Sequence, residues 1–383
     1  MKIESVYFNE EHAAFRESLR KFVEKELRPH ADEWEETGLF PTELFRTFGK
    51  LGYLGLRFPE EFGGQGLDYW YTVILCEELV RCHSLGVGVG LLVQTEMATS
   101  VIDKYGTPEQ KRAFLTPAIA GEKIAALGIT EPGHGSNVAG IRTTARRVGD
   151  EWVINGSKTF ISNGTRANFI TLAARTGGEG ARGVSVILVP TDAKGFTVGR
   201  TLKKMGTHSS DLAELFFEDV RVPVGNLVGE DGRGFAYVME LFQGERLVLA
   251  SFANGIMQVL LEEAMNYGKA RQVFGQPIVQ HQYWRHRLAE TLTQMQAARE
   301  LTYFACDRLN RGLSAQKEVS MAKLYACDLV KRVAETVLQL HGGYGYMEEY
   351  PVCRFYRDVA AFGIGAGTSE VMREIIAKEA IDQ

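Results

Sequence analysis

The sequence contains few cysteines, and their arrangement favours neither a metal site nor a disulfide framework. The five cysteines among 383 residues are Cys76, Cys82, Cys306, Cys327 and Cys353. Their number is odd, no two have CxxC spacing, and no pair of histidines lies near them. We therefore expect reduced thiols within a folded core, a cytoplasmic compartment and no metal site.

An excess of positive charge is also missing. Lys and Arg number 43 against 48 Asp and Glu, which gives a net charge of −5. No broad basic surface is expected to attract nucleic acid or anionic lipid, so a small-molecule partner fits better. The opening MKIESVYFNEEH lacks the apolar stretch of a signal peptide and the Arg-rich character of a transit peptide. No apolar run approaches membrane-spanning length, and no membrane association is expected.

The composition and the first third of the chain predict a large core and a helical start. Hydrophobic residues make up 45% and charged residues 24% of the chain, a balance typical of globular proteins. Apolar residues from Phe15 to Leu27 recur at helical spacing, and Thr107-Pro108 is typical of a helix start. Residues 1–120 are therefore predicted to form an N-terminal all-helical domain.

After Gly121 the pattern changes to short β-rich runs. Turn signals separate these runs, including Asn155-Gly156 and Asn163-Gly164. The spacing leaves no room for long helices between strands and favours an antiparallel barrel or sandwich over a parallel sheet of βαβ units. Residues 121–230 are predicted to form a middle antiparallel β-barrel domain.

From about Gly234 the helical period returns in long stretches. Breaks are expected at Gly275-Gln276-Pro277, at Gly312 and at His341-Gly342-Gly343. Four or five long helices would form a C-terminal four-helix-bundle domain over residues 231–383. The fold class is thus α+β and multidomain.

Two glycine-rich segments suggest cofactor contacts, but with different strength. The GxGxxG string of residues 178–183 precedes a predicted strand, whereas a dinucleotide-binding loop must lead into a helix. We interpret it as a hairpin loop. The segment from Gly128 to Asn137 joins a strand to a loop with hydroxyls and bare amides, which can approach a planar anionic cofactor or can be an ordinary surface loop.

Four ordered motifs resemble the acyl-CoA dehydrogenase family over nearly the whole chain. They are TEPGHGSN at 130–137, WVINGSKTFISNG at 152–164, RQVFGQPIVQHQ at 271–282 and QLHGGYGYMEEYP at 339–351. The first departs from the family's TEPxxGSD at its last position, where Asn137 replaces the acid. The resemblance implies FAD as cofactor. It places Ile129 and Thr130 along the flavin pyrimidine, Ser136 near the pyrophosphate and the acyl-CoA, and Phe160 and Ser162 against the isoalloxazine.

A second set of positions is implied to reach the FAD of a neighbouring subunit. These are Arg271, Phe274, Gln282, Gln339 and Gly343. A guanidinium suits a diphosphate because it forms paired hydrogen bonds, although a single Arg is more often simply solvated at a helix end. The resemblance thus implies a homo-oligomer, most simply a homotetramer, in which subunits share the cofactor.

The catalytic base is the point at which the sequence departs from the best-known members. Those members carry a Glu immediately before Gly-Thr near the C-terminus, where this chain has Ala366. Members resembling the isovaleryl-CoA, long-chain and citronellyl-CoA dehydrogenases place the carboxylate on the first bundle helix before an arginine, and here Glu245 precedes Arg246. Such a dipeptide in an arbitrary helix would be a surface ion pair. The vacancy at Ala366 and the carboxylate at Glu245 support each other.

The resemblance implies roles for the residues around that base. Burial beside a flavin and an acyl chain would raise the pKa of Glu245, and Arg246, next to the substrate, would oppose that shift. The Ala366 N–H would remain an oxyanion donor, and Thr368 would lie near the cofactor. The implied reaction is FAD-dependent α,β-dehydrogenation of a branched or medium- to long-chain acyl-CoA, with electron-transfer flavoprotein as acceptor. Alternatives are a dehydrogenase or oxidase acting on a carrier-bound acyl group, and a non-catalytic flavin-binding scaffold.

Overall fold

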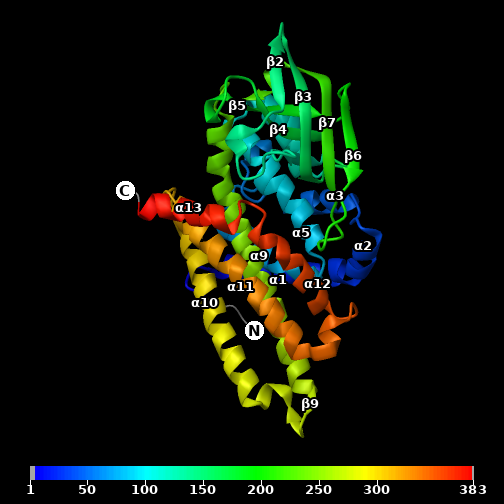
Figure 1. Cartoon of the computed structure of the whole chain (residues 1–383), viewed down its shortest axis with the longest axis vertical. Coiled ribbons are helices and arrows are strands. Elements are labelled where there is room, and N and C mark those ends of the chain that lie inside the picture. Colours follow the sequence, from blue (N-terminus) through cyan, green and yellow to red (C-terminus); the bar gives the residue numbers. More distant parts are fainter. Residues whose placement is uncertain (1–4, 382–383) are drawn as a thin grey trace.

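The computed structural model describes residues 5–381, and its elements follow the predicted order of helices, sheet and helices (Figure 1). The sheet occupies one end of the elongated molecule and the C-terminal helices the other, with N-terminal helices against both. Asn9 and Thr107 cap their helices by accepting hydrogen bonds from the N–H groups of His12 and Gln110. The N-terminal helices are α1 Glu10–Phe22, α2 Ala31–Thr37, α3 Glu43–Lys50, α4 Tyr69–Leu79, α5 Leu85–Leu92, the π-helical segment η5 Val93–Ala98, α6 Ser100–Tyr105, α7 Pro108–Gln110 and α8 Thr116–Ile119.

The middle segment forms one sheet, but that sheet is open and mixed. Its strands are β1 Ala125–Gly128, β2 Thr144–Val148, β3 Glu151–Ser162, β4 Phe169–Arg175, β5 Val184–Pro190, β6 Phe196–Thr201, β7 Leu212–Pro223 and β8 Leu227–Val228. The order is β6-β7-β3-β2-β4-β5-β8, with β1 beside β4. Within residues 5–381 the outer strands β6 and β8 do not pair, so the predicted closed barrel is wrong. The β1–β4 and β2–β4 pairs are parallel, so the sheet is not purely antiparallel.

The two predicted Asn-Gly turns have different outcomes. Asn163 has a φ of 61° directly after β3, as a turn requires. Asn155 and Gly156 instead lie inside β3, at an irregularity of its pairing with β7. The Asn155 side chain exchanges two 2.9 Å hydrogen bonds with Asp219 of β7, which satisfies the irregular backbone without a chain reversal.

The GxGxxG string lies in the connection between the antiparallel strands β4 and β5, as predicted. Arg175, the last residue of β4, donates hydrogen bonds from its guanidinium to the carbonyl oxygens of Gly178 and Gly180. The loop therefore folds around a side chain of its own hairpin, and no helix follows it.

The C-terminal part contains three long helices and two shorter ones, so the prediction of four or five long helices is wrong in number. The chain breaks at Gly275, Gly312 and Gly342, which have φ of 82°, 67° and 59° as glycine permits. A short β9–β10 hairpin, Gln272–Val273 and Gln276–Pro277, caps the far end (Figure 1). The helices are α9 Gly234–Ala270, α10 Gln282–Asn310, α11 Gln316–His341, α12 Pro351–Asp358 and α13 Ser369–Ala380.

Two helical stretches, 85–105 and 234–270, are long and apolar enough on average to cross a membrane. The sequence did not predict them, because neither stretch is an uninterrupted run of apolar residues. Their most apolar windows are 89% and 83% buried inside the protein. They belong to one hydrophobic core that joins the N-terminal helices to the C-terminal helices and reaches β4 and β5. Burial of this kind is typical of the core helices of a soluble protein.

Candidate active site

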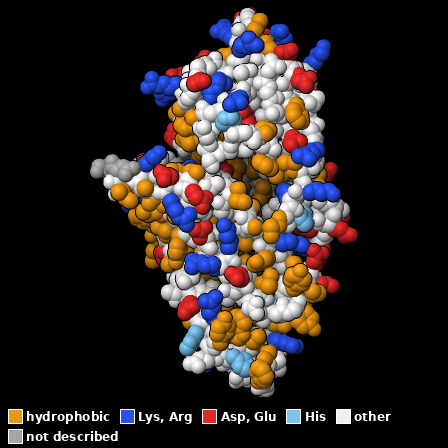
Figure 2. Space-filling model, viewed as in Figure 1, with side chains coloured by type: hydrophobic (Ala, Val, Ile, Leu, Met, Phe, Trp, Pro, Cys, Tyr) orange, Lys and Arg blue, Asp and Glu red, His pale blue; other side chains and the backbone are white. Residues whose placement is uncertain are grey.

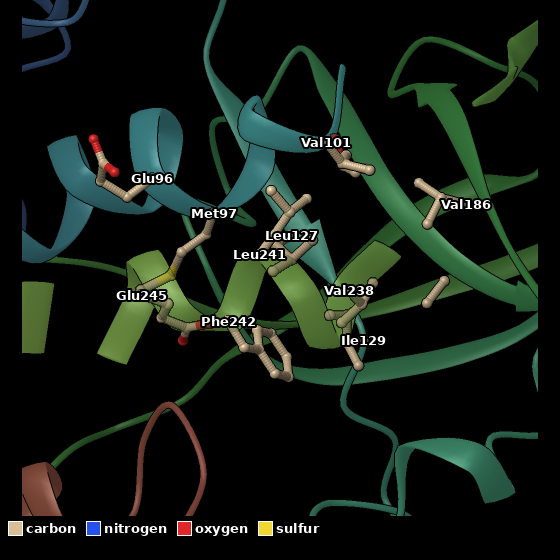
Figure 3. Close-up of a pocket in the computed structure, with 12 residues that line it drawn as sticks. Glu96, Met97, Val101, Leu127, Ile129, Val186, Val238, Leu241, Phe242 and Glu245 are labelled. Atoms are coloured by element: carbon tan, nitrogen blue, oxygen red, sulfur yellow. The ribbon is translucent and has the colours of Figure 1, made fainter. Parts of the chain in front are cut away.

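A small pocket lies where the sheet meets the helices. Figure 2 shows this face of the molecule hollowed at the same level, with hydrophobic side chains around the hollow. The pocket is lined from three directions, by η5 and α6, by the sheet, and by the start of α9 (Figure 3). The lining residues are Glu96, Met97, Val101, Leu127, Ile129, Thr171, Ala173, Val186, Val238, Leu241, Phe242 and Glu245.

Glu245 brings a carboxyl group into this largely apolar pocket. Its side chain and that of Phe242 come from neighbouring turns of α9 and lie on the same side of the helix (Figure 3). Glu245 is 8% exposed, and within the described residues its Oε2 atom is buried without a hydrogen-bond partner. Burial raises the pKa of Glu245 to about 7, against the lowering effects of Arg246 and Lys323. A carboxyl group left unsatisfied at this depth is typical of a site completed by a ligand.

Two cations accompany Glu245 without forming a close ion pair with it. Arg246 is 4% exposed, and its Nε atom has no hydrogen-bond partner in the described chain. Lys323 of α11 is fully buried and donates a 2.6 Å hydrogen bond to the carbonyl oxygen of Gly367. Lys323 thus links the surroundings of Glu245 to the loop that contains Ala366. No motif in the sequence indicated Lys323, because its role depends on two distant segments meeting.

The segment 365–368 forms a tight reversal before the last helix. Ala366 and Gly367 have φ of 55° and 88°, both in the left-handed region. Thr368 is the N-cap of α13, and its hydroxyl accepts a 3.3 Å hydrogen bond from the Val371 N–H. Ala366, where the best-known members carry a carboxylate, therefore lies in a fixed turn. Lys323 holds that turn through the Gly367 carbonyl oxygen, and Thr368 holds it by capping α13.

A buried ion pair supports the loop after β1. Lys158 of β3 is fully buried, and its Nζ donates 2.9 Å hydrogen bonds to Glu131 Oε1 and to the Ile129 carbonyl oxygen. Glu131 also accepts hydrogen bonds from the N–H groups of Arg142 and Thr143, at 2.6 and 2.8 Å. Burial alone would raise the pKa of Glu131, but Lys158 and these N–H groups together lower it to about 2. The pair fixes both ends of the loop 130–141.

The residues predicted beside the flavin lie around that loop. Ile129 lines the pocket with Glu245, and the Thr130 carbonyl oxygen accepts a 2.9 Å hydrogen bond from the Thr159 N–H. Phe160 follows Thr159 with a φ of 59° and leaves 62% of its surface exposed. Ser136 is exposed on the loop, and Ser162 is half-buried at the end of β3. The structure thus brings the loop and the end of β3 together.

The second predicted set lies far from this pocket. Arg271, Phe274 and Gln282 are exposed around the β9–β10 hairpin, and Gln339 and Gly343 are exposed at the end of α11. Arg271 follows the end of α9, 26 residues after Glu245, so at about 1.5 Å per residue it lies about 39 Å along that helix from Glu245. The five positions cluster at the opposite end of the molecule (Figure 1), so one subunit does not bring both sets together.

Comparisons with known proteins cover the whole organisation of the chain. Models of the N-terminal, middle and C-terminal domains of acyl-CoA dehydrogenase match residues 9–122, 126–220 and 232–381. The mitochondrial long-chain specific acyl-CoA dehydrogenase of Mus musculus is 40% identical over 98% of this chain and 87% of its own length. A crystal structure of an acyl-CoA dehydrogenase from Geobacillus kaustophilus is 42% identical, with a TM-score of 0.95 over 99% of this chain and 100% of that one. A glutaryl-CoA dehydrogenase from Mycobacterium smegmatis, solved in complex with FADH2, is 29% identical with a TM-score of 0.93 over 98% and 96% of the two chains.

Proposed function

Because this chain belongs to the acyl-CoA dehydrogenase family, we propose that Glu245 is the base with which it dehydrogenates an acyl-CoA thioester. The chain is an FAD-dependent enzyme of this family. The observation that carries the proposal for Glu245 is its buried carboxyl group, which lies in an apolar pocket with one oxygen unpartnered within residues 5–381. The product is the trans-2-enoyl thioester.

The residues near the pocket fit a flavin. Phe160 holds a bulky side chain at a positive φ, a conformation that is uncommon for an aromatic residue, and leaves its ring uncovered. An added Cβ at Gly133 or Gly135 would meet nothing within 4 Å, so the loop has open space above it. An uncovered ring beside an open, glycine-rich loop suits a planar, anionic cofactor. We therefore assign Ile129, Thr130, Ser136, Phe160, Ser162 and Thr368 to FAD.

The distant set supports a cofactor site shared between subunits. Arg271 carries a permanent cation, and neighbouring Phe274 is 97% exposed. Tyr283, Tyr344 and Tyr346 expose 63%, 49% and 76% of their surfaces at the same end, where Figure 2 shows hydrophobic side chains gathered. Exposed aromatic groups of this kind are typical of protein interfaces. We assign Arg271, Phe274, Gln282, Gln339 and Gly343 to the FAD of a second subunit in a homo-oligomer, most simply a tetramer.

The chain's own residues can remove the α-proton once substrate has entered. Glu245 in its ionised form takes that proton onto its carboxylate, and the apolar lining excludes the water that would otherwise stabilise the charge. Bound FAD supplies the acceptor for the β-hydrogen, which leaves as hydride. A thioester α-carbon is a weak acid, so a hydrogen bond to its carbonyl oxygen is required, and we assign one such donor to the Ala366 N–H. We assign Arg246 to substrate binding; it is buried next to the base and opposes the rise in the pKa of Glu245.

The raised pKa of Glu245 predicts a pH dependence. Because only the ionised carboxylate accepts a proton, kcat/KM for flavin reduction should fall about tenfold per pH unit below pH 7 and level off above it. Anaerobic stopped-flow reduction between pH 5.5 and 8.5 measures this profile. Since Lys323 lowers the pKa of Glu245, Lys323→Met should move the inflection to higher pH. A profile flat through pH 7, or an inflection unmoved in the variant, would count against the assignment.

The absence of a carboxylate at position 366 leaves room near the substrate's β-carbon, and we propose a branched or medium- to long-chain acyl group. Anaerobic titration with a panel of straight and branched acyl-CoAs should give faster flavin reduction for these than for butyryl-CoA. The opposite order would refute this substrate assignment and leave the family unchanged.

We propose electron-transfer flavoprotein as the acceptor and the cytoplasm as the compartment. Turnover coupled to that flavoprotein, with little reduction of oxygen, distinguishes the dehydrogenase from an oxidase.

A further inference from the structure

A second cavity adjoins the pocket that contains Glu245. It is larger than the pocket. It lies between the start of α9, α6 and the loop from Leu309 to Ser314. Glu96 and Leu241 line both cavities, so these two side chains separate them. We call the larger cavity the polar chamber and the two side chains the partition.

The polar half of the partition is held by an ion pair. Glu96 is 6% exposed, and its carboxylate accepts a hydrogen bond from the guanidinium of Arg57 within an ion pair. That guanidinium lies over the ring of Tyr69, 3.8 Å from its centroid. Figure 3 shows Glu96 at one end of the lining side chains, with its carboxylate turned away from Glu245. Leu241, by contrast, has no polar contact to hold it and is half-buried.

The polar chamber differs from the pocket in the groups it offers. Three acidic side chains line it, Glu96, Asp103 and Glu240, against the two cations Arg57 and Lys104. The cations are paired, Arg57 with Glu96 and Lys104 with Glu240. The Nε atom of Arg57 remains a buried donor without an acceptor within the described chain. A neutral group that accepts a hydrogen bond suits this lining, and an additional carboxylate does not.

We infer that the polar chamber binds the far end of a long acyl chain that carries a neutral polar group, such as a terminal hydroxyl, after the chain displaces Leu241 from the partition. The inference rests on the proposed function, because the acyl chain must begin at Glu245. A hydroxyl within the apolar pocket would lose its hydrating water without gaining a hydrogen-bond partner, which is unfavourable. In the polar chamber the same hydroxyl keeps water or accepts a hydrogen bond from Arg57.

The test compares three series of acyl-CoAs from C6 to C16 with the intact FAD enzyme: unmodified, ω-hydroxy and ω-carboxy. Anaerobic flavin reduction gives kcat/KM for each compound. A terminal hydroxyl should lower kcat/KM at least tenfold in the short chains and less than threefold in the longest. A terminal carboxylate should lower it at least tenfold at every length. If the hydroxyl penalty is the same at all lengths, the polar chamber does not receive the chain end.

A larger side chain in the partition provides the second readout. Leu241→Phe should lower kcat/KM for hexadecanoyl-CoA and its ω-hydroxy form at least tenfold more than it lowers kcat/KM for hexanoyl-CoA. The control Leu51→Phe, at a residue 46% exposed after α3, should leave the whole series unchanged. An equal loss at every length in Leu241→Phe would overturn the inference while the proposed function stands. Failure of every acyl-CoA to reduce the wild-type flavin would refute both.

Discussion

Glu245→Gln is expected to retain FAD and to slow acyl-CoA-driven flavin reduction by about 10²- to 10⁴-fold, the usual contribution of a positioned acid–base group. Glutamine has the size of glutamate but cannot take a proton at any relevant pH. Because the wild-type carboxyl is buried with an unpartnered oxygen among the described residues, the neutral amide should not disturb the fold. Stopped-flow absorbance of the flavin under anaerobic conditions measures the loss.

The matched control is Glu263→Gln, on the same helix but 18 residues after Glu245 and outside the pocket lining. Glu263 is half-buried and its pKa is raised by burial, so the control removes a similar carboxyl group without touching the proposed site. It should reduce its flavin at the wild-type rate. Near-normal reduction in Glu245→Gln would refute the assigned base. A yellow wild-type protein inert to a broad acyl-CoA panel would instead favour the scaffold alternative.

Lys158→Met should destabilise the protein by about 3–5 kcal/mol, because it leaves the Glu131 carboxylate buried without its cation. A lowering of the thermal midpoint by about 5 °C or more is the expected readout. The same change should weaken FAD retention, since the ion pair holds the loop that carries Thr130 and Ser136. Flavin released on dilution, followed by fluorescence, measures the second effect.

A double variant separates the lost cation from the lost packing. Lys158→Met with Glu131→Gln removes both charges and should recover part of the stability, because no unpaired ion remains.

The contribution of Glu131 to stability also has a defined pH range. Its folded pKa of about 2 lies below the ordinary 4.5, so its contribution is present above pH 4.5 and is lost as pH falls towards 2. An unchanged midpoint in Lys158→Met would show that the pair does not support the loop.

Sequence patterns predicted what depends on neighbouring residues and missed what depends on distant ones. The helical start, the order of helices and sheet, and the breaks at Gly275 and Gly312 follow from local propensity. The Asn155-Gly156 signal predicted a turn that does not form, because hydrogen bonds between Asn155 and Asp219 on the neighbouring strand keep β3 continuous. The open edges of the sheet were not predictable, since closure depends on which strands meet.

The candidate site shows the same division. Glu245 and the vacancy at Ala366 are visible in the sequence as a shifted motif. Lys323, which lies near the base and holds the Gly367 carbonyl oxygen, comes from a helix with no motif. The partition of Glu96 and Leu241 exists only because η5 packs against the start of α9. Local sequence therefore indicated the chemistry, and the shape of the pocket came from packing.

The most direct measurement of the central claim is a crystal structure of the FAD enzyme with a non-oxidisable acyl-CoA analogue. A carboxylate oxygen of Glu245 should lie within about 3–3.5 Å of the carbon next to the thioester, with the flavin on the opposite face of that carbon. A thioester bound with Glu245 remote from its α-carbon, or with another carboxylate in that place, would contradict it.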